Sequence, residues 1–73
     1  MNVVIAIYCG HVNQEGFRTW EEARKWVESR IPQEAKNIQK TYTGVDAMWN
    51  CLQYEDRKGN TNLWQLVEVR VNE

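Results

Sequence analysis

Cys9 and His11 are the closest approach in this sequence to a nucleophile and its base. A cysteine nucleophile needs a base within hydrogen-bond distance and a third group that orients the base. On a continuous strand the two side chains would point to the same side, but Gly10 lies between them and is expected to break the strand. The sequence specifies no third group. We therefore expect structural roles for both residues and assign no catalytic residue.

The sequence indicates metal binding, phosphate binding and acid–base chemistry by paired carboxylates no more strongly than it indicates cysteine catalysis. The spacing of the soft metal-binding side chains matches no tetrahedral set; these residues are Cys9, His11 and Cys51. Gly10 and Gly16 lie six apart without the Lys-Ser/Thr of a phosphate-binding loop. The adjacent Glu21 and Glu22 would point to different sides of a helix, and capping accounts for one of them. We expect no metal, no cofactor and no enzymatic activity.

Composition places the chain among small globular domains. Its 73 residues predict a single domain over residues 1–73, with 42% apolar and 26% charged residues. Nine basic and ten acidic residues give a net charge of −1. A dedicated nucleic-acid binder usually carries a basic excess, so nucleic acid is not the expected partner.

The apolar run at residues 3–7 is too short for a membrane span or the core of a signal peptide. No membrane association is therefore predicted, and the expected location is the cytoplasm. In that compartment Cys9 and Cys51 are expected to be reduced thiols.

The expected elements are one helix and four strands. The helix is predicted over residues 19–31, with Thr19 as its N-cap, Glu22 completing a capping box and Pro32 ending it. Strands are predicted over residues 3–9, 37–43, 47–55 and 63–71, and residues 11–16 are expected to form a polar loop. The strand at 3–9 is apolar on both faces, which predicts a central position. Lys40 within the strand at 37–43 predicts an edge.

The last two strands are expected to form a hairpin with a three-residue loop, Arg57-Lys58-Gly59. That loop places Trp49 opposite Val67 and Ala47 opposite Val69. The predicted fold class is α+β in two layers: a four-stranded, mainly antiparallel sheet with one helix on one face, in the order strand–helix–strand–strand–strand.

The sheet face that the helix leaves uncovered is the expected working surface. The odd-numbered strand residues are assigned to the helix side, which leaves the even-numbered ones as an exposed apolar patch. The expected anchors are Tyr8, Leu52, Tyr54, Trp64 and Leu66, with Arg57 and Lys58 as rim charges. Two alternatives remain open for this face: it could join two copies of the chain, or the sheet could curl and bury it.

These residues favour a non-enzymatic protein-binding inhibitor or adaptor. The alternative is an oligomeric protein that sequesters a small ligand such as a nucleotide, in a pocket built from Tyr8, His11 and Trp64. A third interpretation is a single-stranded nucleic-acid binding module, because aromatic residues on a sheet can stack bases.

The segment Phe17-Arg18-Thr19-Trp20-Glu21-Glu22-Ala23 leads into the lone helix. With the size and element order of the chain, it resembles small orphan bacteriophage proteins of the anti-defence type, which include the anti-CRISPR proteins. The resemblance implies a phage protein that binds and blocks a host defence protein in the bacterial cytoplasm. It carries over no site residue.

Overall fold

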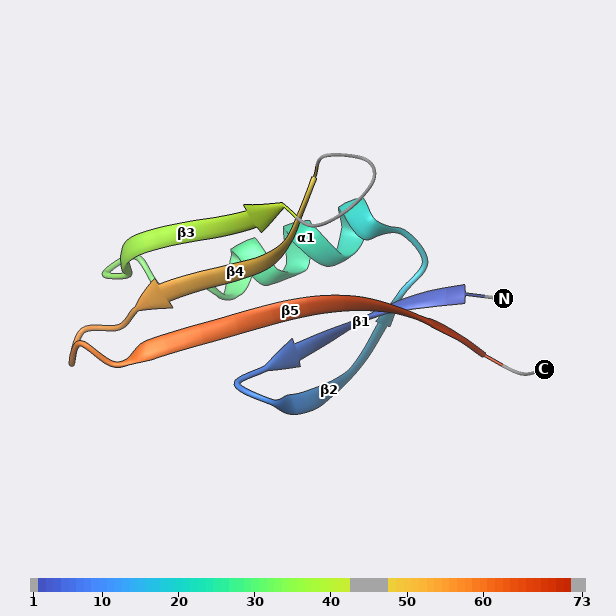
Figure 1. Cartoon of the computed structure of the whole chain (residues 1–73), viewed down its shortest axis with the longest axis horizontal. Helices are drawn as coiled ribbons and strands as arrows, with labels where there is room; N and C mark the ends of the chain where they lie inside the picture. Colours follow the sequence, from blue (N-terminus) through green and yellow to red (C-terminus); the bar gives the residue numbers. More distant parts are fainter. Residues whose placement is uncertain (1, 43–47, 72–73) are drawn as a thin grey trace.

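One helix lies against a five-stranded antiparallel sheet with the strand order β2-β1-β5-β4-β3 (Figure 1). The computed structural model describes residues 2–42 and 48–71, with residues 12–15 described by their backbone alone. The elements are β1 (Asn2–Tyr8), β2 (His11–Phe17), α1 (Trp20–Arg30), β3 (Lys36–Tyr42), β4 (Trp49–Glu55) and β5 (Thr61–Arg70). The predicted α+β class is confirmed, with five strands in place of the predicted four.

The additional strand is β2, which covers the segment predicted to be a loop. Cys9 and Gly10 form a two-residue turn between Tyr8 and its partner His11, and both turn residues have positive φ, 48° and 84°. Positive φ at both positions is what the tight turns of two-residue hairpins require. The glycine therefore reverses the chain into a new strand, and β1 is central, between β2 and β5.

The helix begins and ends as its sequence predicts. The Thr19 side chain accepts a hydrogen bond of 3.1 Å from the Glu22 backbone N–H, which satisfies one free donor at the helix start. The last helical residue is Arg30, and Ile31 is already extended because Pro32 follows it. The capped start and the proline stop limit α1 to 11 residues.

The β4–β5 hairpin has the predicted register. Its pairs run from Glu55↔Thr61 to Cys51↔Gln65. The loop residues 57–59 are closed by a hydrogen bond from the Asp56 N–H to the Asn60 carbonyl, and Gly59 has the positive φ of 83° that the turn needs. The predicted turn at residues 44–46 and the predicted pairing of Ala47 lie outside the described residues.

A bulge in β4 moves Trp49 into the core. Thr41 pairs with Cys51, but the next residue of β3, Tyr42, pairs with Trp49, so Asn50 is an extra residue on β4. Because strand side chains alternate, one extra residue reverses the face of everything beyond it. Trp49 is consequently only 4% exposed, although regular alternation would place an odd-numbered residue on the opposite face of the sheet.

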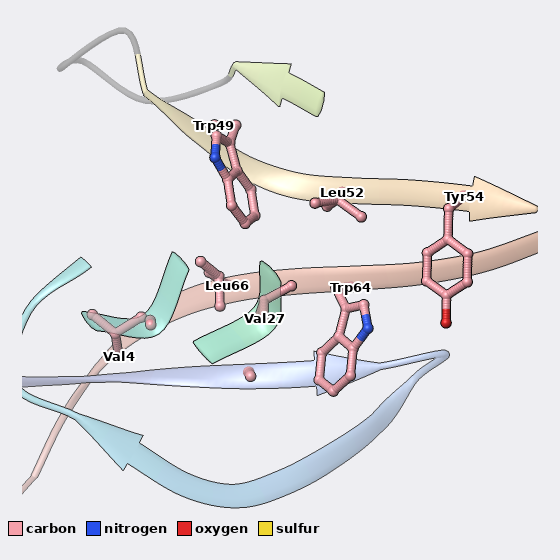
Figure 2. Close-up of a cluster of buried hydrophobic side chains, with 9 residues drawn as sticks. Val4, Val27, Trp49, Leu52, Tyr54, Trp64 and Leu66 are labelled. Atoms are coloured by element: carbon pink, nitrogen blue, oxygen red, sulfur yellow. The ribbon is translucent and has the colours of Figure 1, made fainter. Parts of the chain in front are cut away.

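The core lies between α1 and the even-numbered side of the sheet, opposite to the predicted side (Figure 2). Ala23 and Val27 of the helix are fully buried and are both small. The remaining volume comes from the sheet, whose core residues are Val4, Ala6, Trp49, Leu52, Tyr54, Trp64 and Leu66. The assignment of the odd-numbered strand residues to the helix side was therefore wrong.

Candidate protein-binding surfaces

Four of the predicted anchors are core residues. Leu52 and Leu66 are each 1% exposed, and Trp64 and Tyr54 are 5% and 6% exposed. The Trp64 ring packs edge-on against Trp26 of the helix, with centroids 5.4 Å apart. The expectation that these four side chains lie on an uncovered face is corrected, because the helix covers that face. Their burial removes the reason for choosing them as contact residues.

Tyr8, the fifth predicted anchor, is half-buried and belongs to a polar network. Its hydroxyl donates a hydrogen bond to the side-chain oxygen of Asn62. The Asn62 amide donates to Asp56 at 3.2 Å and to the Asn60 carbonyl at 3.1 Å. Burial, together with the neighbouring Tyr54 hydroxyl, raises the pKa of Tyr8 to about 12. The network ties β1 to the β4–β5 loop, which is a structural role.

The two predicted rim cations, Arg57 and Lys58, are exposed in the loop that Asp56 organises. One Asp56 carboxylate oxygen accepts hydrogen bonds of 2.9 Å from the backbone N–H groups of Asn60 and Lys58. The N–H of Asn60, and then the Asn62 side chain, hold the pKa of Asp56 below its usual value. The two cations thus stand on a fixed loop at one end of the molecule.

The side of the sheet away from the helix, which we call the open face, is aliphatic. Its central residues are Val3, Ile5, Ile7, Leu63, Val67 and Val69, where β1 and β5 lie next to each other. Val67 is 38% exposed and the other five are half-buried. An antiparallel sheet with one solvated face normally alternates apolar residues inside with polar residues outside. The open face departs from that pattern.

The open face also lacks charge and aromatic rings over its described centre. The neighbouring residues of β4 and β5 on this side, Cys51, Gln53 and Gln65, are neutral. Lys36 and Glu55, paired across β3 and β4 at the rim, are the charged residues that the described strand pairs place here. The rings of Tyr8, Phe17, Tyr54 and Trp64 all belong to the helix side or pack against its core. Among the described residues, base stacking on the open face, as considered for nucleic acid, would have no ring to use.

A second surface lies between α1 and the edge strand β3. All seven residues of β3 are exposed, and β3 is the last strand of the sheet. A groove of about 280 Å³ runs beside it, lined by Glu28, Ile31, Ile38, Lys40 and Leu52. Helix, edge strand and groove thus form one continuous surface, which we call the β3 groove.

Polar and aromatic contacts surround the β3 groove. The Lys40 ammonium lies 3.6 Å from the Glu28 carboxylate and 5.4 Å from the centre of the Trp49 ring. Ile38 and Tyr42 share the side of β3 that faces the groove and are 51% and 60% exposed. This surface therefore combines apolar, aromatic and charged groups, in contrast to the open face, whose centre is mainly aliphatic.

The residues examined for chemistry are placed apart from one another. Cys9 is exposed in the β1–β2 turn, whereas Cys51 is half-buried in β4, and both are free thiols. Within residues 2–42 and 48–71, no three His, Cys, Asp or Glu side chains gather in a way that could hold a metal ion. In the same part of the chain, no helix has the length and apolar character needed to cross a bilayer.

Sequence reasoning missed both surfaces although signals for them were present. Val and Ile recur at the odd positions of two strands, and the large rings at the even ones. Rings bury roughly 150–250 Å² each and belong in a core whose fully buried apolar helix residues, Ala23 and Val27, are small. For the β3 groove the signal was the apolar Ile38 and Tyr42 on a strand already recognised as an edge.

Three comparisons with known proteins found no match to this chain. No protein-family model matches the sequence, and neither the curated proteins nor the solved structures gave a match.

Proposed function

We propose that this chain is a non-enzymatic protein-binding protein that adds an extended segment of its partner to β3. The observation that carries the proposal is the edge strand itself, seven residues long, exposed throughout and lying beside a groove. An edge strand presents unpaired backbone N–H and C=O groups, and strand addition is a common way to bind an extended peptide. Backbone pairing would supply affinity, and the groove would supply specificity.

The size of the groove favours an anchoring side chain over a small-molecule ligand. Pockets for drug-sized ligands usually measure about 300–1,000 Å³ and enclose most of the ligand. The β3 groove, at about 280 Å³, falls just below that range and is open. Its apolar lining of Ile31, Ile38 and Leu52 suits one large apolar side chain of the partner. The nucleotide-sequestering alternative named Tyr8, His11 and Trp64 as its pocket, and none of these three residues lines the groove.

The charges at the groove would orient the partner. Lys40 and Glu28 come from the strand and the helix, and their side chains are 36% and 50% exposed. A carboxylate on the partner would compete with Glu28 for Lys40, whereas a cation would compete for Glu28. Exposed charges of this kind act mainly on association rate and on salt dependence. The exposed ring of Tyr42 supplies the residue type that most often dominates binding energy.

On this proposal the protein acts by occlusion. A bound segment would be held as a sixth strand and kept from its own partners. Anti-defence activity against a host protein in the bacterial cytoplasm, which the resemblance to small phage proteins implies, is the setting we propose for this mechanism.

The test has two stages. Affinity purification from the native host with mass spectrometry identifies a candidate partner, and binding is then measured between purified proteins. Tyr42→Ala and Ile38→Asp should each weaken binding by about 30- to 1,000-fold. Because both side chains are more than half exposed, the melting temperatures of the two variants should stay within a few degrees of that of the parent. Lys25→Ala on the outer helix face is the matched control and should bind normally.

Hydrogen exchange provides the signature of strand addition. Backbone amides within residues 36–42 should become protected when the purified partner binds, because new inter-strand hydrogen bonds form there. Unchanged exchange in β3, or full binding by both variants, would contradict the proposed surface.

A further inference from the structure

We infer that the open face is the interface of a homodimer, in which two copies of this chain stack their sheets face to face. The inference concerns a different surface from the β3 groove and goes beyond the proposed function. It begins from an imbalance in the fold: a five-stranded sheet has two faces, and its one helix of 11 residues covers only one of them.

The side chains of the open face are those of a sandwich interior. Val3 and Ile5 of β1 pair with Val69 and Val67 of β5, and Ile7 follows opposite Gln65, which creates a mainly aliphatic stripe along these two neighbouring strands. Valine and isoleucine on inward faces are what two stacked sheets interdigitate, with the sheets about 10 Å apart. Extensive apolar surface on a small domain is usually covered by a partner.

Charge identifies a second copy as the occupant. The described centre of the open face carries no charge, so two copies stacked on it place no like charges together. At the rim, Lys36 and Glu55 have opposite charges, so a two-fold arrangement can place Lys36 of one copy opposite Glu55 of the other. Interfaces with reversible partners are more polar than permanent homodimer interfaces, which resemble a domain core cut in half. The open face matches the second kind, and the β3 groove matches the first.

The area is sufficient for a specific dimer. Five strands about 4.8 Å apart and seven residues rising about 3.3 Å each give a face of roughly 500 Å² in projection. Two stacked copies therefore bury about 1,000 Å² or more in total, which reaches the lower end of specific interfaces. The dimer would leave both β3 grooves free, because β3 is an edge strand and the groove is on the helix side.

The first test measures mass in solution by light scattering and sedimentation. The parent should show about twice the 8.7 kDa of one chain at micromolar concentration. Val67→Lys places a charge at the centre of the open face and should raise the dimer dissociation constant at least about tenfold. Glu68→Gln is the control, because it makes the same change in net charge on the neighbouring residue of β5, which points to the helix side. It should remain dimeric.

A single-chain mass for the parent up to about 500 µM, or an unchanged dimer with Val67→Lys, would overturn the inference. Circular dichroism checks that the lysine variant is folded, as expected at a position already 38% exposed.

The second test needs no substitution on the open face. Cys51 lies on that face beside Gln65, and Cys9→Asn removes the other thiol. The rate at which a thiol reagent labels Cys51 should fall at least about tenfold from dilute to concentrated protein, because dimerisation covers it. A labelling rate independent of protein concentration would contradict the dimer. The outcome is separable from the β3 proposal, since a monomer could still bind a partner at β3.

Discussion

The Arg24 guanidinium donates a hydrogen bond of 2.8 Å from Nε to the backbone carbonyl of Trp49. Arg24 is only 8% exposed, and its guanidinium also lies over the Trp20 ring at 5.6 Å. The carbonyl lies next to the bulge at Asn50, where the sheet ladder is interrupted. A helix side chain thus joins α1 to the backbone of β4 beside the bulge.

Arg24→Met should lower the free energy of unfolding by about 2–3 kcal/mol, because it keeps much of the side-chain volume but removes the buried, charge-assisted hydrogen bond to the Trp49 carbonyl. Urea denaturation measures the change. Arg30→Met is the control: Arg30 is exposed and stacks on Trp26 at 4.6 Å, so its loss should cost about 1 kcal/mol or less. Equal costs for the two variants would contradict the role of the buried hydrogen bond.

Trp64→Ala should cost about 3–5 kcal/mol, as expected for a buried aromatic residue. A chain of this length has a total stability of about 4–11 kcal/mol, so the variant should lose a large part of it and melt at a much lower temperature than the parent. Trp64→Phe should cost less, because it keeps a ring and removes an indole N–H that is buried without a partner. Thermal denaturation by circular dichroism distinguishes the two. A melting temperature for Trp64→Ala near that of the parent would show that the ring lies outside the core.

Cys9→Asn should stabilise the protein by about 0.5–1 kcal/mol, because asparagine before glycine is preferred in two-residue hairpin turns with positive φ. Gly10→Ala should act in the opposite direction, since φ at Gly10 is 84° and a side chain there is strained even though nothing lies within 4 Å of the added carbon. Melting temperatures should therefore move apart in the two variants. A rise or no change with Gly10→Ala would contradict the turn geometry.

Tyr8→Phe should flatten the dependence of stability on alkaline pH. The pKa of Tyr8 is raised to about 12 in the folded protein from about 10 in the unfolded chain, so the folded state favours the neutral phenol. The stabilisation from this group is complete below pH 10 and is lost as pH rises through 12. The parent should exceed the variant in stability at pH 8, with the difference shrinking between pH 10 and 12. Denaturation midpoints across that range measure it, and a constant difference would argue against the raised pKa.

Local signals in the sequence were sufficient for the helix limits and for the β4–β5 register. A capping threonine, a terminating proline and a loop with a positive-φ glycine each act over a few residues, so their consequences can be predicted without knowing the rest of the fold.

Predicting which face of the sheet the helix covers required non-local information. Both parities of β1 are apolar, so alternation alone could not choose between them. The choice depends on volume: Ala23 and Val27 leave room that only the large residues of the even positions can fill. The burial of Arg24 depends on non-local information too, because the Trp49 carbonyl that it contacts lies on a strand far along the chain.

The pairing of β1 with β5 also bears on how the molecule is made. Asn2 pairs with Arg70, so two neighbouring strands of the sheet, β1 and β5, are the first and the last of its five described strands along the chain. The β1–β2 hairpin can form early, but Ala23 and Val27 have no Leu66 or Trp64 to pack against until β5 leaves the ribosome. Closing so long a segment carries a large entropy cost and slows folding relative to domains built from local contacts. The apolar residues of β1 and α1 therefore stay exposed until β5 has been made, and apolar surface exposed in this way is prone to aggregation.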